Sequence, residues 1–225
     1  MANDLTLYDY FRSSASFRVR IALNLKGLTY AQVPVHLLRD GGEQFSAAYR
    51  AINPAQAVPT LMIGSGSEAI PIAQSLAIIE YLEEVYPQPS LLPTSPEDRA
   101  YVRSVAYQIA CDIHPINNLR VLKYLQATFG ANEDQKKIWI GNWITTGFSA
   151  LEEMFSTNSR TGKFVFGDEP SLADICLVPQ VWNARRYGVP LDAYPTLLRI
   201  ADDAGARKAF ADADPSVEPR RRMQG

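Results

Sequence analysis

The stretch RSSASFRVRIALNLKG, from Arg12 to Gly27, decides the fold of the first part of the chain. Its apolar residues recur at helical spacing, and Gly27 stands where the C-cap of a helix is expected. The β-rich run LTLYDY, from Leu5 to Tyr10, precedes it. The sequence therefore predicts a strand followed by a helix from Ser16 to Lys26.

Three serines, Ser13, Ser14 and Ser16, stand where this helix begins. A serine hydroxyl at an N-cap accepts a hydrogen bond from an unpaired backbone NH, which contributes about 1 kcal/mol. The same helix end presents unpaired NH groups and about half a positive charge to an anion, including a thiolate. The stretch has no cysteine, since Ala15 follows Ser14. Both roles for the serines stay open at this point.

Strand and helix signals continue to alternate in the residues that follow. Pro34 interrupts the second strand and suits either a strand at the edge of a sheet or the end of a strand. The sequence GSGS separates two apolar runs and indicates a hairpin. We expect the two hairpin strands, the second strand and the closing helix at Val58–Ile63, Glu68–Ala73, Tyr30–Leu37 and Gln74–Pro87, respectively. This order predicts a mixed sheet with a parallel first crossover and an antiparallel hairpin.

A proline-rich segment, YPQPSLLPTSPEDR from Tyr86 to Arg99, contains four prolines and is the best linker candidate. We expect a first domain over residues 1–86, a linker over residues 87–96 and an all-helical domain over residues 97–214. The helical patterns run over residues 97–129, 133–156, 171–186 and 195–213. The polar residues 215–225 are expected to form a disordered tail rather than a nucleic-acid contact.

The composition indicates a globular protein and excludes several classes of partner. The chain has 225 residues, 47% of them hydrophobic, and a net charge of -2, which gives no overall attraction to nucleic acid or to an anionic membrane. No apolar run approaches the roughly 20 residues that span a bilayer, and no signal peptide is recognised, so we expect a cytoplasmic location. Cys111 and Cys176 are expected to be reduced and buried. His36 and His114 have no partners at ligand spacing, so no metal site is expected.

A valine-proline pair, Val58-Pro59, directly precedes one strand of the predicted hairpin. The proline is either a residue that ends strand pairing or the site of a cis peptide. In the second case the backbone NH and C=O of Val58 face outward and pair with a peptide-like ligand, as an added strand does.

Two further helix starts carry polar pairs. Gln74 and Ser75 precede an apolar run, where they form either an N-cap or a carboxylate site built from two NH groups and a hydroxyl. Ser171 and Asp174 have the spacing of a capping box, which we interpret as a folding device. The GSGS sequence lacks the lysine of a phosphate-binding loop and does not open a helix, so a nucleotide site is excluded.

Five blocks of the sequence, taken in order, resemble the zeta-class glutathione transferases. They are YFRSSASFRVRIALNLKGL, NPAQAVPTL, IAQSLAIIEYLEE, CDIHPINNLRVLKYL and SLADICLVPQVWNARRY. The resemblance runs from about Leu5 to about Phe210. It implies the glutathione transferase fold, in which a thioredoxin-like α/β domain with a mixed four-stranded sheet precedes an all-α domain. It also implies a homodimer with glutathione bound in the first domain.

The resemblance also implies a set of site residues. Ser13 matches the residue that supports the glutathione sulfur, with Ser14 beside it, while Ala15 replaces the cysteine of many members. The implied nucleophile is therefore the thiol of glutathione, its pKa lowered by the helix N-terminus and a serine hydroxyl. The residues implied to hold glutathione are Ser13, Ser14, Gln44, Val58, Pro59 in cis, Gln74, Ser75, His114, which replaces a glutamine of some members, and Asn118.

The reaction that this resemblance implies is the cis-trans isomerisation of maleylacetoacetate to fumarylacetoacetate. The thiolate adds to the double bond, the resulting single bond rotates, and elimination returns glutathione. A maleyl substrate is a dicarboxylate, and the fork of an arginine suits a carboxylate. Arg12 and Arg186 are the candidates for this contact, with Arg120 as a third.

Three alternatives stay open. Maleylpyruvate shares the maleyl end and is the nearest rival substrate. Conjugation of glutathione or dehalogenation of α-halo acids uses the same thiolate. A module that keeps the fold for assembly and has lost catalysis belongs to a different class. Retention of Ser13, of Val58-Pro59 and of Gln74-Ser75 favours an enzyme.

Overall fold

The computed structural model describes residues 4–217 and divides the chain into two compact units. The first unit runs to Ser90 and takes in the chain again from Lys208 onward, and the second is Leu91–Arg207. The division falls inside the predicted linker of residues 87–96. It corrects the other boundary, because residues 208–214, which we assigned to the helical domain, belong to the first unit.

The first unit is built on a four-stranded mixed sheet with the order β2-β1-β3-β4. β1 pairs parallel with β2 and antiparallel with β3, and β3 forms an antiparallel hairpin with β4. The strands are β1 at Leu5–Asp9, β2 at Ala31–Pro34, β3 at Thr60–Ile63 and β4 at Ile70–Ala73. The fold class, the parallel crossover and the hairpin are confirmed. β2 is an edge strand, as its terminal Pro34 predicted.

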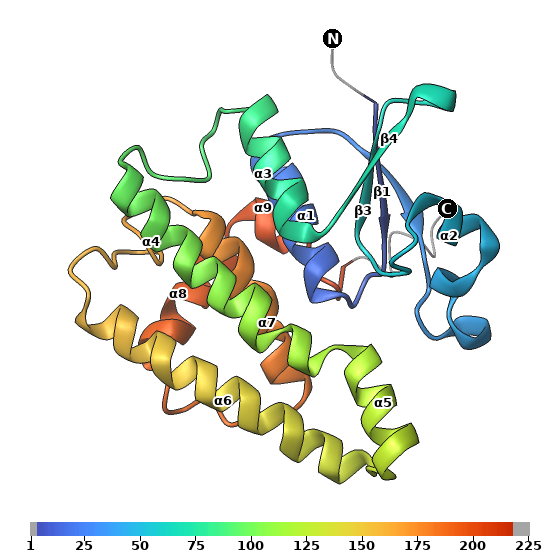
Figure 1. The fold of residues 1–225 in the computed structure, drawn as a ribbon. Helices are drawn as coiled ribbons and strands as arrows, with labels where there is room; N and C mark the ends of the chain where they lie inside the picture. The colour runs from blue at the N-terminus through green and yellow to red at the C-terminus, as the bar shows by residue number, and fades with distance from the viewer. Residues whose placement is uncertain (1–3, 218–225) are drawn as a thin grey trace. The chain divides into compact units, whose positions relative to one another are not determined.

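Four helices belong to this unit. They are α1 at Ser14–Leu25, α2 at Ala47–Ile52, α3 at Ser75–Val85 and α9 at Lys208–Ala211. α1, α3 and α9 lie on one face of the sheet, and α2 lies on the other (Figure 1). Apolar side chains of α1 and α3, including Phe17, Leu23 and Ile78, are fully buried. Each such burial stabilises the fold by roughly 1.5–3 kcal/mol.

The predicted helix at Ser16–Lys26 is confirmed with shifted ends. It begins two residues earlier, because Ser13 caps it and accepts a hydrogen bond from the backbone NH of Ser16 at 3.2 Å. It ends at Leu25, one residue before the predicted end, and Gly27 follows the cap as expected: its φ of 66° lets the NH of Leu28 reach the carbonyl of Leu23 at 3.0 Å.

A buried ion pair closes the far end of α1. Lys26 Nζ lies 2.5 Å from Glu83 Oε2 on α3 and donates to the carbonyl of Pro89 at 2.7 Å. Ser90 Oγ donates to the other oxygen of Glu83 at 2.7 Å. These bonds tie α1, α3 and the end of the first unit together and satisfy charges that would be costly to bury alone.

The second unit contains five α-helices: α4 at Pro96–Tyr107, α5 at Leu119–Phe129, α6 at Glu133–Thr157, α7 at Leu172–Arg186 and α8 at Pro195–Gly205. α7 packs against α4 and α8, and α6 packs against α8. The helical pattern predicted over residues 97–129 does not form one uninterrupted helix. It is interrupted by a π-helical turn at Gln108–Ile113 and a 3-10 turn at Pro115–Asn117, since Pro115 has no NH to continue the helix.

The last predicted helix, over residues 195–213, is also interrupted. α8 ends at Gly205, and the short helix α9 begins only at Lys208. Glycine at the end of a helix exposes the backbone and lowers the propensity to continue. The break coincides with the point where the chain returns to the first unit.

The capping box of α7 is confirmed. Asp174 is fully buried, and its carboxylate accepts hydrogen bonds from Ser171 Oγ and from the backbone NH groups of Ser171 and Val165, at 2.8, 2.8 and 2.9 Å. Burial raises the pKa of Asp174, and these bonds act in the opposite direction. One carboxylate thus fixes both the start of α7 and the loop before it.

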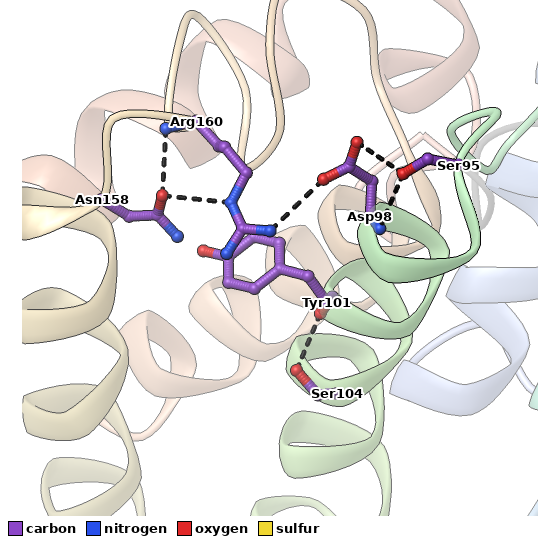
Figure 2. A network of polar contacts seen from close by, with 6 residues as sticks. All are labelled: Ser95, Asp98, Tyr101, Ser104, Asn158 and Arg160. Atoms are coloured by element: carbon purple, nitrogen blue, oxygen red, sulfur yellow. Dashed lines mark hydrogen bonds and ion pairs between the residues drawn. The ribbon is translucent and has the colours of Figure 1, made fainter.

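A polar network ties the start of α4 to the loop after α6 (Figure 2). Ser95 caps α4 and donates its hydroxyl proton to Asp98 at 2.8 Å. The guanidinium of Arg160 lies 4.2 Å above the centre of the Tyr101 ring and donates to Asp98 at 3.3 Å. Asn158 Oδ1 accepts from the backbone NH of Arg160 at 3.0 Å. Because Arg160 and Asp98 are partly exposed, their ion pair contributes at most about 1 kcal/mol.

The structure also bears on the expectations for the two cysteines, the tail and a membrane span. Neither cysteine forms a disulfide, but Cys111 is exposed and only Cys176 is buried, so the expectation of burial is wrong for Cys111. Of the predicted disordered tail, residues 215–217 form a turn, and residues 218–225 lie outside the described residues. Within residues 4–217 no helix is long and apolar enough to cross a membrane.

Candidate active site

Three of the predicted site segments meet at one edge of the sheet. β1 ends at Asp9, β3 begins at Thr60 and β4 ends at Ala73. Tyr8 pairs with Thr60, and Thr60 pairs with Ala73. The serines that follow β1, the Val58-Pro59 pair that precedes β3 and the Gln74-Ser75 pair that follows β4 therefore leave the sheet side by side. Strand pairing places these polar groups together even though they are distant in sequence.

The N-terminus of α1 is the most polar part of this edge. Ser13 is half-buried and its Oγ accepts the NH of Ser16, so its hydroxyl proton remains available to donate to an anion. Ser14 is 3% exposed and lies within the helix itself. The first turn contains no acidic residue to offset the positive end of the helix dipole. Ser13 is thus better placed than Ser14 to support a thiolate.

The N-terminus of α3 provides a second anion-binding end. Gln74 has φ of 73°, a left-handed conformation that costs a non-glycine residue about 1 kcal/mol or more. Ser75 is 6% exposed, and its Oγ accepts a hydrogen bond from Nη1 of the buried Arg18 at 3.5 Å. This contact joins α1 to α3 and puts a cation behind the helix end. Sequence reasoning missed Arg18, although a charged residue among the apolar positions of α1 was the available signal.

The Val58-Pro59 peptide bond is cis, as expected. Two hydrogen bonds from buried side chains, which form a brace, support the loop before it. Tyr49 donates its hydroxyl proton to the carbonyl of Ala57 at 2.7 Å, and Asn53 Nδ2 donates to the same oxygen at 2.8 Å. Burial raises the pKa of Tyr49, which keeps this hydroxyl protonated as a donor. Nothing in the sequence indicated the brace, because its members are spread over a helix and a loop.

Gln44 lies in a short turn after β2, the strand whose end pairs with the end of β1. It is 5% exposed, and no described residue bonds its buried Oε1. A Cβ on Gly42 would come within 2.6 Å of Gln44 Nε2, so the glycine lets this amide lie against the backbone. Glu43 and His36 close the turn: Glu43 Oε2 accepts the NH of His36 at 2.6 Å, and the NH of Glu43 donates to the carbonyl of His36 at 2.8 Å.

Arg12 belongs to the first unit and is exposed. Its guanidinium carbon lies 4.9 Å from the centre of the neighbouring Phe11 ring. It directly precedes Ser13, the cap of α1, so its long side chain is anchored beside the helix N-terminus.

The other predicted residues belong to the second unit. His114 ends the π-helical turn, and Asn118 caps α5 by accepting the NH of Arg120 at 3.1 Å. Arg120 is exposed, as is Arg186 near the end of α7. The guanidinium of Arg186 lies 5.2 Å from the centre of the Tyr187 ring. His114 and Asn118 lie in consecutive turns of the chain, where the helical pattern predicted over residues 97–129 is interrupted.

Comparison with known proteins supplies the family. Residues 7–90 match the model of the glutathione S-transferase N-terminal domain, and residues 142–205 match that of the C-terminal domain. The chain is 49% identical to maleylacetoacetate isomerase of Pseudomonas aeruginosa over 96% of its length and 98% of that protein. It is 46% identical to maleylpyruvate isomerase of a Ralstonia species over 96% of its length and 99% of that protein.

The fold of the chain is also similar to solved structures of maleylpyruvate and maleylacetoacetate isomerases. The holo structure of a maleylpyruvate isomerase, described as a bacterial zeta-class glutathione transferase, has a TM-score of 0.89 and 45% identity, and the match covers 95% of this chain and 98% of that one. Maleylacetoacetate isomerase of Methylobacterium extorquens, solved with malonate and glutathione bound, has a TM-score of 0.89 and 40% identity, with 96% and 98% covered. The chain belongs to the glutathione S-transferase family and, within it, to the zeta class.

Proposed function

We propose that this protein is a glutathione-dependent cis-trans isomerase that converts maleylacetoacetate to fumarylacetoacetate. The observation that carries the proposal is the meeting of the Ser13 helix end, the cis Val58-Pro59 bond and the Gln74-Ser75 helix end at one edge of the sheet. High identity over nearly the whole chain to maleylacetoacetate isomerases supports it. Glutathione is the cofactor, as in relatives solved with it bound.

The chemistry uses the thiolate of glutathione as nucleophile. Its electron pair forms a bond to one carbon of the cis double bond, and the π electrons move onto the conjugated carbonyl as an enolate. The former double bond is now single and rotates. Collapse of the enolate then expels the thiolate and forms the trans double bond, so no atom is gained or lost and glutathione is returned.

In this proposal the first unit holds glutathione along its length. The N-terminus of α1 and the Ser13 hydroxyl stabilise the thiolate, with Ser14 behind them. Val58 pairs with the peptide backbone of glutathione, and the cis Pro59 orients that pairing. Gln74 and Ser75 take the γ-glutamyl carboxylate. Gln44 supplies a further polar contact from the first unit, and the family resemblance implies two more, from His114 and Asn118 of the second unit.

Arginines complete the proposed site. The substrate carries two carboxylates, each of which loses hydration on binding and requires a cationic partner. Arg12 beside the thiolate site and Arg186 on α7 are the proposed anchors, with Arg120 as a third. Both Arg12 and Arg186 already lie against aromatic rings, which limits the conformations of their side chains before substrate binds.

We expect Ser75→Ala to weaken glutathione binding by about tenfold or more, because it removes a hydrogen bond to a charged carboxylate, worth about 1.5–3 kcal/mol. At saturating glutathione, kcat should stay within about threefold of the wild-type value, since Ser75 acts away from the thiol. Calorimetric titration with glutathione gives the first quantity and the isomerase assay the second. Ser104→Ala, which removes an exposed hydroxyl of α4, is the matched control and should change neither. A larger fall in kcat than in affinity would contradict the assignment of Ser75.

The substrate is chosen by a direct assay. Loss of the conjugated chromophore of maleylacetoacetate is followed with and without glutathione, coupled to a hydrolase that accepts only the trans product, and maleylpyruvate is run in parallel. We expect turnover with both maleyl compounds and a higher kcat/KM for maleylacetoacetate. A higher value for maleylpyruvate would favour the alternative that 46% identity to a maleylpyruvate isomerase already supports. Glutathione binding without turnover of either would point to conjugation chemistry or to a non-catalytic module.

We propose further that the protein acts as a cytoplasmic homodimer with no nucleic-acid or membrane partner. The net charge of -2 and the family's usual assembly support this arrangement. Sedimentation equilibrium should give twice the 25.0 kDa chain mass. A single-chain mass at assay concentrations would exclude the dimer.

A further inference from the structure

A single buried side chain connects three separate segments of the first unit. Arg20, on α1, is 0% exposed. Its Nη1 donates to Asp9 Oδ2 at 2.8 Å, its Nη2 to the carbonyl of Phe11 at 3.0 Å, and its Nε to the carbonyl of Ala213 at 3.0 Å. All three nitrogens of the guanidinium thus donate hydrogen bonds, each to a different residue.

Two of these partners, Asp9 and Phe11, lie at the start of or within the serine loop, residues 10–13, which joins β1 to α1. Asp9 is the last residue of β1, so it marks the start of the loop. The Phe11 carbonyl lies in the middle of the loop, two residues before Ser13. The loop closes where the NH of Ser13 donates to the carbonyl of Tyr10 at 2.9 Å. Arg20 therefore fixes the loop from inside the protein at its start and at its middle.

The third partner adds the return segment, residues 208–214, which re-enters the first unit after the second unit is complete. Two side chains of α1, one turn apart, hold it: Arg20 at Ala213 and Asn24 at the carbonyl of Ala209, the latter at 2.9 Å. Only Arg20 also contacts the serine loop. One guanidinium therefore joins the return segment to the loop that leads into Ser13, the residue that we place at the thiolate.

We propose that Arg20 is a positioning residue for the proposed isomerase, holding the serine loop so that Ser13 and the α1 N-terminus face the glutathione sulfur. This inference rests on the proposed function. The planar fork of arginine can hold three acceptors in fixed directions, which a lysine cannot. A buried charge is costly without such partners, and the Asp9 carboxylate supplies the counter-charge. Arg20 does not touch the substrate; it acts through Ser13.

The same α1 helix offers two matched controls. Lys26 belongs to the other buried ion pair of α1, with Glu83, and its partners lie at the opposite end of the helix. The side chain of Asn24 bonds the return segment, and none of its described hydrogen bonds reaches the serine loop. Replacing either weakens the fold without touching the loop. A loss of stability can therefore be separated from a loss of positioning.

The test compares Arg20→Lys and Asp9→Asn with Asn24→Ala and Lys26→Met, using the full chain. The main measurement is the pKa of enzyme-bound glutathione, read from the ultraviolet absorbance of its thiolate as pH is varied. We expect Arg20→Lys to raise this pKa by about one unit and to lower kcat about tenfold at pH values well below the thiol pKa, where the fraction of thiolate falls tenfold. The dissociation constant of glutathione should change less than about threefold. Asp9→Asn should shift both quantities in the same direction by a smaller amount.

The controls should lower the unfolding midpoint and leave the thiol pKa at the wild-type value. An unchanged thiol pKa and kcat in Arg20→Lys and Asp9→Asn would overturn the proposal and leave Arg20 a purely structural residue, as would an equal shift in the controls. If Arg20→Lys fails to fold, Asp9→Asn carries the comparison. A wild-type protein that binds glutathione but turns over no maleyl compound would refute the proposed function, whereas the thiol pKa would still report on Arg20.

Discussion

Ser13→Ala is expected to lower kcat for isomerisation about 100-fold while changing the affinity for glutathione less than about threefold. The removed hydroxyl proton is the donor to the thiolate, and donors to a developing or full negative charge are typically worth 10²–10³ in rate. In the proposed arrangement most of the glutathione molecule is held elsewhere, at Val58, Gln74 and Ser75, so binding should survive. The measurement is steady-state kinetics at saturating glutathione together with calorimetric binding.

The cap function of Ser13 has to be separated from this effect. Alanine also removes the acceptor for the NH of Ser16, which costs about 1 kcal/mol of stability. Ser13→Thr keeps both the acceptor and the hydroxyl proton and should retain most of the activity. Ser14→Ala is the second control, and we expect a much smaller loss of kcat because Ser14 is buried in the helix. Full activity in Ser13→Ala would remove Ser13 from the mechanism, and a loss confined to Ser14→Ala would exchange the two roles.

Asp174→Ala is expected to lower the free energy of unfolding by about 3–4 kcal/mol. The substitution leaves two buried backbone NH groups and one hydroxyl without their acceptor, and each such group costs roughly 1–3 kcal/mol. Asp174→Asn should cost less, about 2 kcal/mol, because the amide oxygen can still accept one of these bonds. Urea unfolding followed by circular dichroism gives the values.

The unfolding free energy of Ser171→Ala is the reference against which that of Asp174→Ala is compared. It removes only the hydroxyl of the capping box and should cost about 1 kcal/mol. Asp174 is not among the proposed glutathione contacts, so the folded fraction of Asp174→Asn should bind glutathione as the wild type does. A change in unfolding free energy below about 1 kcal/mol for Asp174→Ala would show that this carboxylate does not organise α7.

The local rules of the sequence predicted the elements that depend on local chemistry. Pro34 marked an edge strand, the glycines around Ser65 marked a hairpin, and Ser171 with Asp174 marked the start of α7. In each case the physical cause lies within a few residues: a missing NH, a turn that favours glycine, or a side chain that reaches a nearby backbone NH. The antiparallel pairing of β3 with β4 over four residue pairs likewise depends on the glycine-rich turn between them.

Features that depend on tertiary contacts were not predictable in this way. The interruption after α4 falls in a stretch with good helical periodicity, and only Pro115 hinted at it. Arg18 and Arg20 read as ordinary charged positions of a helix, because burial of a guanidinium depends on acceptors supplied by distant segments such as Ala213. The site was found from its polar helix starts, while the side chains that support it required the fold.

In the proposed reaction glutathione is a coenzyme that is returned at every turnover. The direct test is to incubate the protein with maleylacetoacetate and a much smaller amount of glutathione, and to measure both the trans product and the remaining free thiol. We expect many turnovers per glutathione, complete recovery of the thiol, and no enzymatic isomerisation when glutathione is omitted. Consumption of one glutathione per substrate with formation of a stable adduct, or isomerisation without glutathione, would contradict it.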